Sequence, residues 1–511
     1  MFNWNRVIKK FIPKLLKKFY HFALAKLAAF VYGYPSRKLI VVGITGTGGK
    51  SSTVYLLARL LEAAGWKVGA TSTVFFKIGE WEKLNDKKMT MLGRFQTQKM
   101  LRQMVRTGCK AAIIETTSQG IEQFRHLDID YNTVVLTNLY PEHIEAHGGF
   151  ENYKRAKGKL FATHPKTSIV NADDANAEYF LNFPAENKIK FNLADLRDLK
   201  LDEQGIYFVW NNARFDLPLL GKFNAYNALC VLTIAKSLGL SIEEIQKAAP
   251  AMQNIPGRLE FIDEGQLFKI IVDYAYEPKA MAGLYETIKM IPHQKVIHVL
   301  GSTGGGRDKA RRPILGQIVG KQADYAIITN EDPYDENPQE IIDQVTKGAL
   351  LAGKKKGENL WRILDRREAI GKAISLAVAG DLILITGKGA EQAICVANEK
   401  KIPWDDRRVA RELLKNNMSE EKSKYPIGSF VDLFTNEKGN RRLRAHCVLQ
   451  ADGAVICTGD TDVLTALDRG VSVLIDNEPR YYQPKDGAKF LLAMSAHFSN
   501  SYLFASEITQ P

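Results

Sequence analysis

A glycine-rich segment near the start of the chain has the residue types needed to hold a nucleoside triphosphate. An apolar, β-branched run at 39–44 precedes it, and a helical pattern of leucines follows it. In this context glycines let backbone N–H groups close around phosphate oxygens, and the helix N-terminus adds partial positive charge. The lysine would neutralise the β- and γ-phosphates, and the first serine would bind Mg²⁺. The predicted phosphate-binding residues are Gly46, Thr47, Gly48, Gly49, Lys50, Ser51 and Ser52.

The segment departs from the strict phosphate-loop pattern G-x-x-x-x-G-K-[ST], because Ile44 occupies the first glycine position. Two interpretations follow: a phosphate loop, or a glycine-rich turn with an incidental lysine. The order of strand, turn and helix favours the phosphate loop.

Strand and helix patterns alternate along most of the chain and must position this loop. Strands are predicted near 39–45, 67–73, 111–115 and 133–137, and a second set near 268–273, 295–300, 324–329 and 381–385. Such alternation is typical of parallel sheets with flanking helices, in which ligands bind at the carboxyl ends of the strands. Glu115 follows the apolar residues 111–114 and is therefore predicted at such a strand end.

The loop Gly43-Ile-Thr-Gly-Thr-Gly-Gly-Lys-Ser-Ser-Thr53 resembles the ATP loop of the Mur ligase family. These are the ATP-dependent amide ligases of peptidoglycan synthesis, with folylpolyglutamate synthetase as a relative. Similarity recurs in order from Lys38 to about Leu414 and looks closest to the MurE type, which adds the third residue to the UDP-MurNAc-dipeptide. Further matching segments are 114–125, 137–148, 153–157, 171–174, 221–227, 256–260, 273–278, 307–313, 387–391 and 404–407.

The resemblance implies that a carboxylate is activated by ATP as an acyl phosphate and is then attacked by an amine. It implies two Mg²⁺ ions, one held by Ser51 and Glu115 and the other by His143 and Lys157. Lys157 would act as its N6-carboxylated form (a carbamate), because an ammonium cannot bind a metal ion. Other interpretations stay open: Glu115 as a helix cap, His143 as a turn histidine, and Lys157 as a solvated lysine.

Further site residues are implied by the same resemblance. Asn224 and Asn227 would meet the adenine, and Arg258 and Asp273 would reach the phosphates and ribose. Alternatively the two asparagines cap a helix, and the arginine is a surface charge. The remaining positions are Lys309 near the transferred phosphoryl group, with the alternative of a surface charge; Thr90, Ser118 and Arg125 at the peptidyl acceptor; and Gly387 and Glu391 at the incoming amino acid.

The sequence departs from the family pattern where that pattern reads diaminopimelate. The Asp-Asn-Pro-Arg element appears as Glu331-Asp-Pro-Tyr334, so a distal carboxylate would lack its cation. Three usual histidines are Gln119, Tyr276 and Ala390. We therefore expect intact ATP chemistry with an open choice of amino acid.

The formal net charge of +13 is concentrated in one arm: residues 1–38 contain nine basic residues and no acidic residue. Apolar residues recur there at helical spacing, but the stretch is too short and too charged to span a bilayer. Three interpretations remain: a helix docked on its own protein, an interfacial helix on anionic lipid, or a nucleic-acid arm. No aromatic–basic stacking platform accompanies the arm, so we expect no nucleic-acid partner.

These patterns, together with the resemblance to Mur ligases, imply an α/β protein with four parts. They are a basic amphipathic helical arm (1–36), a central P-loop Mur ligase domain (37–256), a Rossmann-like C-terminal Mur ligase domain (257–418), and a small α+β or β-rich extension of unknown role (419–511). The arm stands where MurE-type enzymes carry a UDP-sugar-binding domain. Five scattered cysteines with no CxxC pair favour a reducing compartment.

We therefore expect a cytoplasmic ATP- and Mg²⁺-dependent ligase that joins an amino acid to a peptidyl carboxylate in peptidoglycan precursor synthesis. Attachment at the inner face of the membrane through residues 1–36 is a further expectation. Two alternatives stay open. One is a ligase for another acceptor, such as a lipid-linked muropeptide, polyglutamate or folate-like tail. The other is a membrane-associated P-loop NTPase without ligase activity.

Overall fold

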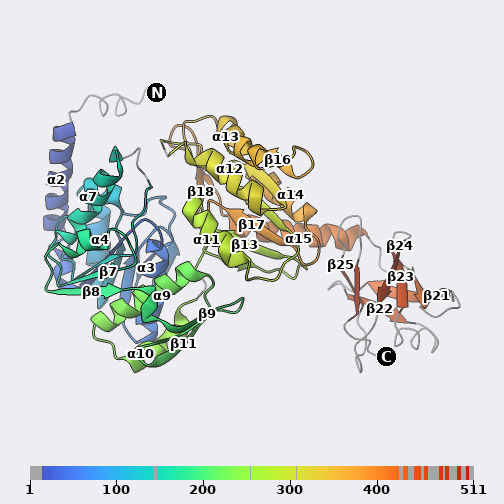
Figure 1. Cartoon of the computed structure of the whole chain (residues 1–511), viewed down its shortest axis with the longest axis horizontal. Helices are drawn as coiled ribbons and strands as arrows, with labels where there is room; N and C mark the ends of the chain where they lie inside the picture. The colour runs from blue at the N-terminus through green and yellow to red at the C-terminus, as the bar shows by residue number, and fades with distance from the viewer. Residues whose placement is uncertain are drawn as a thin grey trace. The chain divides into compact units, whose positions relative to one another are not determined.

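The computed structural model describes residues 14–142, 147–253, 255–306 and 308–424, and seven strands of the C-terminal segment. The chain forms two compact units (Figure 1). The first comprises Met1–Ile262, Lys269–Ile370 and Gly380–Arg407, and the second comprises Asp263–Phe268, Gly371–Ala379 and Arg408–Pro511.

The first sheet of the first unit carries the predicted phosphate loop. Its eight described strands run in the order β4-β3-β2-β5-β1-β6-β7-β8. The central strand β1 pairs in parallel with β5 and β6, as the alternating pattern predicts, and only β3 and β4 at one edge are antiparallel. The strands are β1 (Ile40–Thr45), β2 (Val68–Thr71), β3 (Phe75–Ile78), β4 (Trp81–Leu84), β5 (Ala111–Glu115), β6 (Thr133–Leu136), β7 (Thr167–Asn171) and β8 (Asn187–Phe191).

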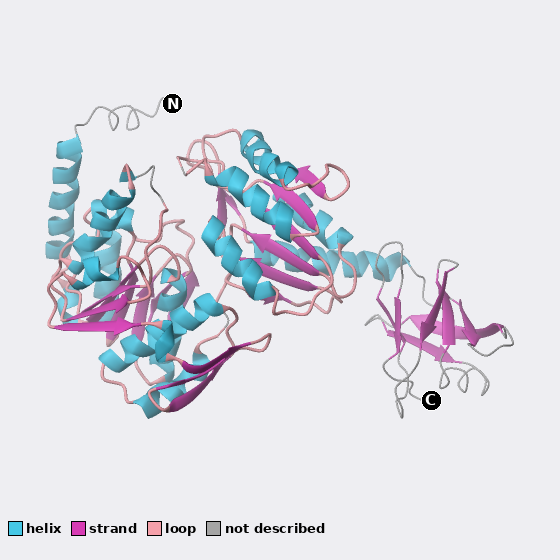
Figure 2. Ribbon diagram, viewed as in Figure 1, coloured by secondary structure: helices cyan, strands magenta, loops and turns pink. Residues whose placement is uncertain are grey.

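Helices cover both faces of this sheet (Figure 2). Alternate residues of β1 explain why: Val42 and Ile44 belong to one apolar core and Val41 to another. The helices are α3 (Lys50–Ala63), α4 (Arg94–Arg106), α5 (Ser118–Glu122), α7 (Phe150–Phe161), α8 (Ala177–Leu181), α9 (Lys222–Ser237) and α10 (Ile242–Ala248), with short 3-10 turns η1 (Pro35–Lys38), η2 (Leu193–Asp195) and η3 (Ala249–Ala251).

A small antiparallel sheet lies between β8 and α9 in the chain and was not predicted from the sequence. It contains β9 (Arg197–Leu201), β10 (Ile206–Trp210) and β11 (Ala213–Leu217), in the order β11-β10-β9. Phe208 and Phe215 stack at 5.3 Å between ring centroids and are buried in the same core as α3 and α9.

The second sheet of the first unit has the described strand order β12-β13-β17-β14-β15-β16. All neighbours pair in parallel except the edge strand β12, which confirms the second predicted set. The elements are β12 (Glu260–Ile262), β13 (Lys269–Asp273), α11 (Pro278–Ile288), β14 (Val296–Leu300), α12 (Arg311–Gln322), β15 (Tyr325–Thr329), α13 (Pro338–Leu351), β16 (Leu360–Ile363), α14 (Arg366–Leu376), β17 (Leu382–Thr386), β18 (Ala393–Cys395) and β19 (Lys401–Pro403).

The basic arm contains a helix, α2 (Lys14–Val31), that packs on α4; residues 1–13 lie outside the described part of the chain. Small side chains, Ala25, Ala28 and Ala29, face the protein and are at most 2% exposed. Lys26 forms an ion pair with Asp128 at 2.8 Å. Among the described residues, no helix is long and apolar enough to cross a membrane.

The second unit is rich in β-strands, as predicted. Its described strands form an antiparallel sheet in the order β24-β23-β20-β21-β22-β25-β26, preceded by α15 (Asp406–Lys424). The strands are β20 (Phe430–Thr435), β21 (Arg442–Leu449), β22 (Ala454–Thr458), β23 (Val471–Ile475), β24 (Glu478–Tyr482), β25 (Leu492–Ser495) and β26 (Tyr502–Ala505).

Candidate functional site

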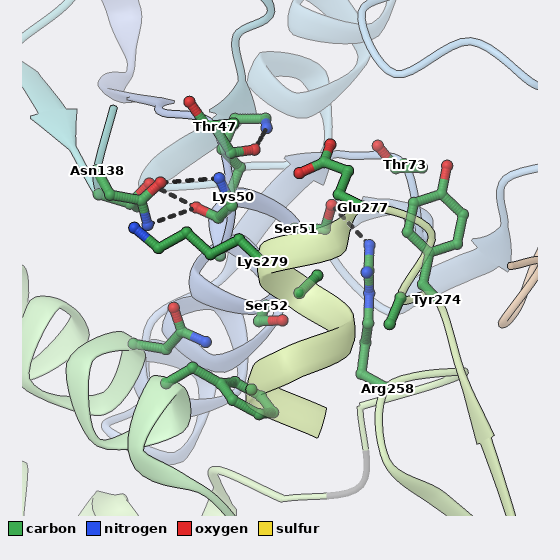
Figure 3. Close-up of a pocket in the computed structure, with 18 of the residues that line it drawn as sticks. Thr47, Lys50, Ser51, Ser52, Thr73, Asn138, Arg258, Tyr274, Glu277 and Lys279 are labelled. Carbon is green, nitrogen blue, oxygen red and sulfur yellow. Dashed lines mark hydrogen bonds between the residues drawn. The ribbon is translucent and has the colours of Figure 1, made fainter. Parts of the chain in front are cut away.

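The glycine-rich loop joins the end of β1 to the start of α3. Gly49 has φ +79°, a conformation that L side chains rarely adopt, and a Cβ there would collide with Oδ1 of Asn227. The loop is closed by Asn138 and Thr137 after β6. Asn138 Oδ1 accepts from the Gly48 N–H at 2.8 Å (Figure 3). The Thr137 hydroxyl donates to the Gly48 carbonyl at 2.7 Å. The strand–turn–helix arrangement that favours a phosphate loop is therefore present.

Lys50 lies at the first turn of α3 and donates from Nζ to the Thr47 carbonyl oxygen at 2.6 Å. Burial lowers the pKa of Lys50, while the carboxylates of Glu115 and Glu277 oppose that shift. The negative charge of a bound polyphosphate would stabilise the protonated form of this buried amine.

Glu115 ends β5, as predicted, and its side chain is 2% exposed. Its Oε2 accepts the backbone N–H of Thr73 at 2.8 Å. Thr73 lies in the connection between β2 and β3. The carboxylate therefore fixes the connection between β2 and β3 through a hydrogen bond and does not cap a helix.

Lys157 on α7 is 2% exposed, which rules out a solvated lysine. Its Nζ donates to the Gly46 carbonyl oxygen at 2.7 Å and lies 4.5 Å from the ring centroid of Tyr153. Burial first, and the neighbouring Lys50 second, hold the pKa of Lys157 well below its usual range. The side chain is thus aimed into the phosphate loop.

His143 lies outside the described residues, so its predicted role stays a prediction. The nearby His147 is described: its Nε2 lies 3.0 Å from the Ser118 hydroxyl. Within the described ranges no group of three or more His, Cys, Asp or Glu side chains could hold a metal ion. The metal ligands predicted from the sequence also include a serine hydroxyl and a lysine carbamate, which are not among those four side-chain types.

Asn224 and Asn227 meet on one face of α9, with Asn227 Nδ2 donating to Asn224 Oδ1 at 3.0 Å. Neither caps the helix, because the N-cap residue is Gly221, with no side-chain hydrogen bond. Asn227 instead touches the loop at Gly49.

Arg258 reaches the loop from the segment before β12. Its Nη2 lies 3.5 Å from Ser51 Oγ, and its guanidinium covers the Tyr274 ring at 4.1 Å (Figure 3). Asp273 at the end of β13 accepts the backbone N–H groups of Leu259 and Ala275 at 2.8 and 2.7 Å. Asp273 therefore orients the segment that contains Arg258. Because Arg258 reaches Ser51 in the loop, it is not an ordinary surface charge.

Lys309 is placed differently. Its side chain is 62% exposed and pairs with Glu336 at 3.4 Å. It does not line the cavity that most of the other predicted site residues line.

One cavity of about 920 Å³ joins the phosphate loop to the predicted acceptor residues. That volume is within the range of ligand sites, roughly 300–1,000 Å³. Of the predicted residues its lining includes Thr47, Gly48, Gly49, Lys50, Ser51, Ser52, Thr90, Glu115, Ser118, Arg125, Asn227, Arg258 and Asp273.

The acceptor residues are held by their own neighbours. The Thr90 hydroxyl lies 2.8 Å from that of Thr73. Arg125 Nη2 donates to Gln123 Oε1 at 2.6 Å, and its Nη1 donates to the Met91 carbonyl. The guanidinium is therefore fixed at the edge of the cavity.

The residues predicted to hold the incoming amino acid take part in ion pairs that were not predicted from the sequence. Lys388 is fully buried; it donates to Asp332 Oδ1 at 2.8 Å and forms an ion pair with Glu391 Oε2 at 2.8 Å. Lys88 also binds Asp332, at 2.7 Å, and Glu391. Lys388 lies inside the predicted segment 387–391. Lys88 is 244 residues from Asp332 and 303 residues from Glu391 in the sequence and carries no local signal.

Glu277 and Lys279 were also missed. Glu277 is 5% exposed and accepts a hydrogen bond from the Tyr140 hydroxyl at 3.2 Å. Lys279 Nζ lies 4.4 Å from the Tyr140 ring centroid (Figure 3). Their position in the segment 273–278 and just after it could have identified them.

Comparison with known proteins supports the resemblance to Mur ligases over most of the chain. Residues 44–235 match the Mur ligase middle domain, and residues 257–389 match the Mur ligase, glutamate ligase domain. UDP-N-acetylmuramyl-tripeptide synthetase of Roseiflexus sp. (strain RS-1) is 37% identical over 417 residues, covering 77% of this chain and 82% of the relative. A UDP-N-acetylmuramoyl-L-alanyl-D-glutamate--2,6-diaminopimelate ligase of Bacillus cereus is 32% identical, with 82% and 86% covered.

Solved structures agree on the fold. A UDP-N-acetylmuramoyl-L-alanyl-D-glutamate--2,6-diaminopimelate ligase superposes with a TM-score of 0.51 at 29% identity, covering 74% of this chain and 79% of the other. Folylpolyglutamate synthase of Mycobacterium tuberculosis, complexed with ADP and AMPPCP, has a TM-score of 0.57 at 17% identity, with 71% and 91% covered, and shows the fold alone.

The fold and the loop geometry, together with these relatives, define an ATP-dependent acid–amino-acid ligase. The chain belongs to the Mur ligase family, whose members depend on ATP and Mg²⁺ and act on small molecules. Both the resemblance and the α/β fold predicted from the sequence are thereby confirmed.

Proposed function

We propose that this ligase joins an amino acid to a peptidyl carboxylate in cytoplasmic peptidoglycan precursor synthesis. The observation that carries the proposal is the cavity of about 920 Å³ that the phosphate loop, Arg258 and the acceptor residues line together. The acceptor carboxylate oxygen attacks the γ-phosphorus, and ADP leaves. The amine then attacks the acyl carbon, inorganic phosphate leaves, and the amine proton passes to solvent or a nearby base.

The residues around the loop neutralise and orient the nucleotide. Lys50 and Arg258 place two cations at the phosphates, from α3 and from the segment before β12. Asn224 and Asn227 would contact the adenine, and Asp273 the ribose. Lys309, now paired with Glu336, would reach the transferred phosphoryl group only after leaving that partner.

Two Mg²⁺ ions fit the donor set at the loop. Ser51 and Glu115 would hold one ion, and His143 with carboxylated Lys157 the other. When bound, such ions neutralise the charge that develops on the phosphate oxygens. Burial of Glu115 and Lys157 beside the loop supports this assignment, since both side chains are withdrawn from solvent next to the proposed phosphate site.

Carboxylation of Lys157 requires a neutral amine, and burial favours that form. The amine nitrogen attacks CO₂, one N–C bond forms, and one proton is released. The resulting carbamate supplies the oxygen ligands that an ammonium lacks.

Thr90, Ser118 and Arg125 would hold the acceptor, with the Arg125 fork facing a carboxylate. Gly387 and Glu391 would hold the incoming amino acid. The test measures ADP release and adduct mass with a panel of peptidyl acceptors and amino acids. We expect ADP release only when both substrates are present. Release that ignores both would support an NTPase and contradict the proposal.

We also propose that residues 1–36 attach the enzyme peripherally to the inner face of the membrane. A specific observation favours this: the outward face of α2 is apolar. Leu16, Phe19, Leu27, Phe30 and Val31 are 49–71% exposed there. Lys18 is exposed on the same helix, and Lys26, which pairs with Asp128, is half-exposed. An apolar stripe with basic borders is the pattern of an interfacial helix on anionic lipid.

The membrane proposal is tested by sedimenting the full chain with vesicles of phosphatidylglycerol and phosphatidylcholine. We expect binding that weakens at high salt and is lost in a Phe19→Ser/Phe30→Ser variant. Trp81→Ser, at another exposed aromatic on β4, should bind as the parent does. Equal sedimentation of the parent with and without vesicles would refute the attachment.

A further inference from the structure

The acceptor residue Ser118 is backed by a buried histidine that has no role in the reaction proposed above. Ser118 lines the large cavity, whereas His147 does not. The His147 side chain is 2% exposed, and its Nε2 lies 3.0 Å from the Ser118 hydroxyl oxygen. Any effect of this ring on a bound acceptor is therefore expected to pass through the hydroxyl.

The other nitrogen of the ring lacks a hydrogen bond. Nδ1 of His147 is buried and has no hydrogen-bond partner among the described residues. A carboxylate oxygen of Glu122 lies 3.9 Å from it, which is too far for a hydrogen bond but close enough for an electrostatic effect. A buried polar nitrogen without a partner is costly, so the surroundings of the ring are incomplete in the free enzyme.

A neutral imidazole has one N–H, and neither position of that proton suits both neighbours of His147. With the proton on Nε2, the lone pair of Nδ1 faces the Glu122 carboxylate. With the proton on Nδ1, Nε2 accepts the hydroxyl proton of Ser118, which then presents only lone pairs to the cavity and repels an anionic acceptor. The imidazolium form resolves the conflict, because Nε2–H donates to Ser118 while Nδ1–H points to the carboxylate.

The free enzyme nevertheless disfavours the imidazolium. Burial lowers the pKa of His147, and the carboxylate of Glu122 on α5 opposes that shift. Lys157 and Lys159 on α7 add to the lowering, and the Tyr153 ring lies 5.3 Å away between centroids. In the part of the chain that the structure describes, these four side chains are the titratable groups that face the ring. At neutral pH the ring is therefore neutral in the free enzyme.

A bound acceptor would change this balance. Its carboxylate would arrive at the end of the cavity that Ser118 and Arg125 line. A negative charge close to a histidine stabilises the protonated ring. The same carboxylate requires donors, and Ser118 can donate its hydroxyl proton only if Nε2 of His147 is itself a donor.

We propose that His147 takes up a proton from solvent when the acceptor binds, and that it thereby turns the Ser118 hydroxyl into a hydrogen-bond donor for an acceptor carboxylate. One N–H bond forms on the ring, no bond of the acceptor breaks, and the proton returns to solvent when the product leaves. The inference rests on the proposed function and deepens it, since it makes His147 a positioning residue of the acceptor site.

The experiment measures proton uptake during acceptor binding by isothermal titration calorimetry of the full chain. ADP and Mg²⁺ are present and the amino acid is absent, so that no bond to the acceptor forms. The probe is the UDP-MurNAc-dipeptide; if it supports no ADP release, the panel acceptor that does so replaces it. The slope of the binding enthalpy against the ionisation enthalpy of the buffer gives the protons taken up. We expect uptake of up to about one proton per acceptor, larger at about pH 6 and 7 than at about pH 8.

His147→Gln is the matched variant, because its amide can donate to Ser118 but does not titrate. It should lose the proton uptake. In the parent, KM for the acceptor should rise between about pH 6 and 8, by at most about tenfold per pH unit, while kcat changes much less. That rise should be absent in His147→Gln. His147→Ala, which leaves Ser118 without a donor, should raise KM for the acceptor more than His147→Gln does.

His164→Gln, at an exposed histidine, is the control and should keep the proton uptake of the parent. Acceptor binding without proton uptake at any of the three pH values would overturn the inference, even if no His147 variant folds. Undiminished uptake in a folded His147→Gln variant would also overturn it, since the proton would then belong to another group. If no pair of acceptor and amino acid gives product, the proposed function is wrong, and this inference with it.

Discussion

The Nζ atom of Lys157 on α7 lies 2.7 Å from the carbonyl oxygen of Gly46 in the phosphate loop. A helix that follows β6 thus delivers a buried amine to the turn that follows β1. Because β1 and β6 are parallel neighbours, their carboxyl ends lie at one sheet edge, and both connections meet there. A carbamate on Lys157, as proposed above, would therefore lie beside the proposed phosphate-binding loop.

Lys157→Ala should lower kcat by roughly 10²–10³, the usual cost of removing one charge-stabilising group. Binding of ATP should change much less, because Lys50 and the loop backbone remain. The measurement is steady-state ADP release at saturating ATP, without and with added acetate or propionate. A small carboxylate should restore part of the rate if it can replace the carbamate.

Lys159→Ala is the matched control, since Lys159 is on the same helix and its side chain is 53% exposed. It should retain the full rate. Full activity of Lys157→Ala would show that no carbamate is required.

Gly49→Ala should abolish nucleotide binding. The added Cβ would meet Asn227 Oδ1 and would also force an alanine into φ +79°. Gly65→Ala provides a matched control: its φ is +82°, and open space surrounds the new Cβ. We expect Gly65→Ala to cost about 1–2 kcal/mol of stability and to bind a fluorescent ATP analogue normally. Equal binding by both variants would mean that contact between the loop and α9 does not matter.

The sequence allowed both parallel sheets to be predicted, because their strands are apolar runs with glycine-rich or charged ends. It did not allow the β9–β11 sheet to be predicted. The strand β9 (Arg-Asp-Leu-Lys-Leu) is dominated by charged residues, and β11 (Ala-Arg-Phe-Asp-Leu) alternates apolar and charged residues. Their apolar side chains become significant only by packing against α9, a contact that no local pattern reveals.

Some residues of the candidate site could be predicted from the sequence and others could not. Loop residues were predictable because glycine, lysine and serine must be adjacent in sequence to surround a phosphate. The burial of Lys157 was not, since Lys154, Arg155 and Lys159 around it give α7 a solvated appearance. Lys88 could not be identified at all, because its partners Asp332 and Glu391 come from the other sheet.

Asp406→Asn should destabilise the first unit by about 3–5 kcal/mol. The side chains of Arg366 and Asp406 are at most 1% exposed, and removing one charge leaves the other buried without its partner. Glu178→Gln removes one partner of the exposed Lys190 pair and should cost no more than about 1 kcal/mol. Urea unfolding followed by circular dichroism measures both. Equal midpoints for the two variants would show that the buried pair contributes nothing beyond a surface pair.

Stability should fall as the solution becomes acidic, and His298 on β14 should contribute to that fall. The ring is fully buried, with Nδ1 2.6 Å from the Tyr285 hydroxyl and Nε2 2.9 Å from that of Thr386. Burial, with Arg366 second, lowers the pKa of His298 to about 3. The unfolded chain, with a histidine pKa of about 6.5, therefore binds more protons than the folded chain between these values.

The stabilising effect of a neutral His298 is thus complete above about pH 6.5 and is lost as the pH falls toward 3. One such group accounts for about 2 kcal/mol between pH 6.5 and 5. We expect Tm to drop over this interval, and the drop to be smaller in His298→Gln, which has no proton to gain. His126, whose pKa burial lowers to about 4, would leave part of the drop in place. The exposed His164→Gln variant is the control and should keep the parent's pH dependence; an unchanged slope in His298→Gln as well would exclude His298 as a source of acid sensitivity.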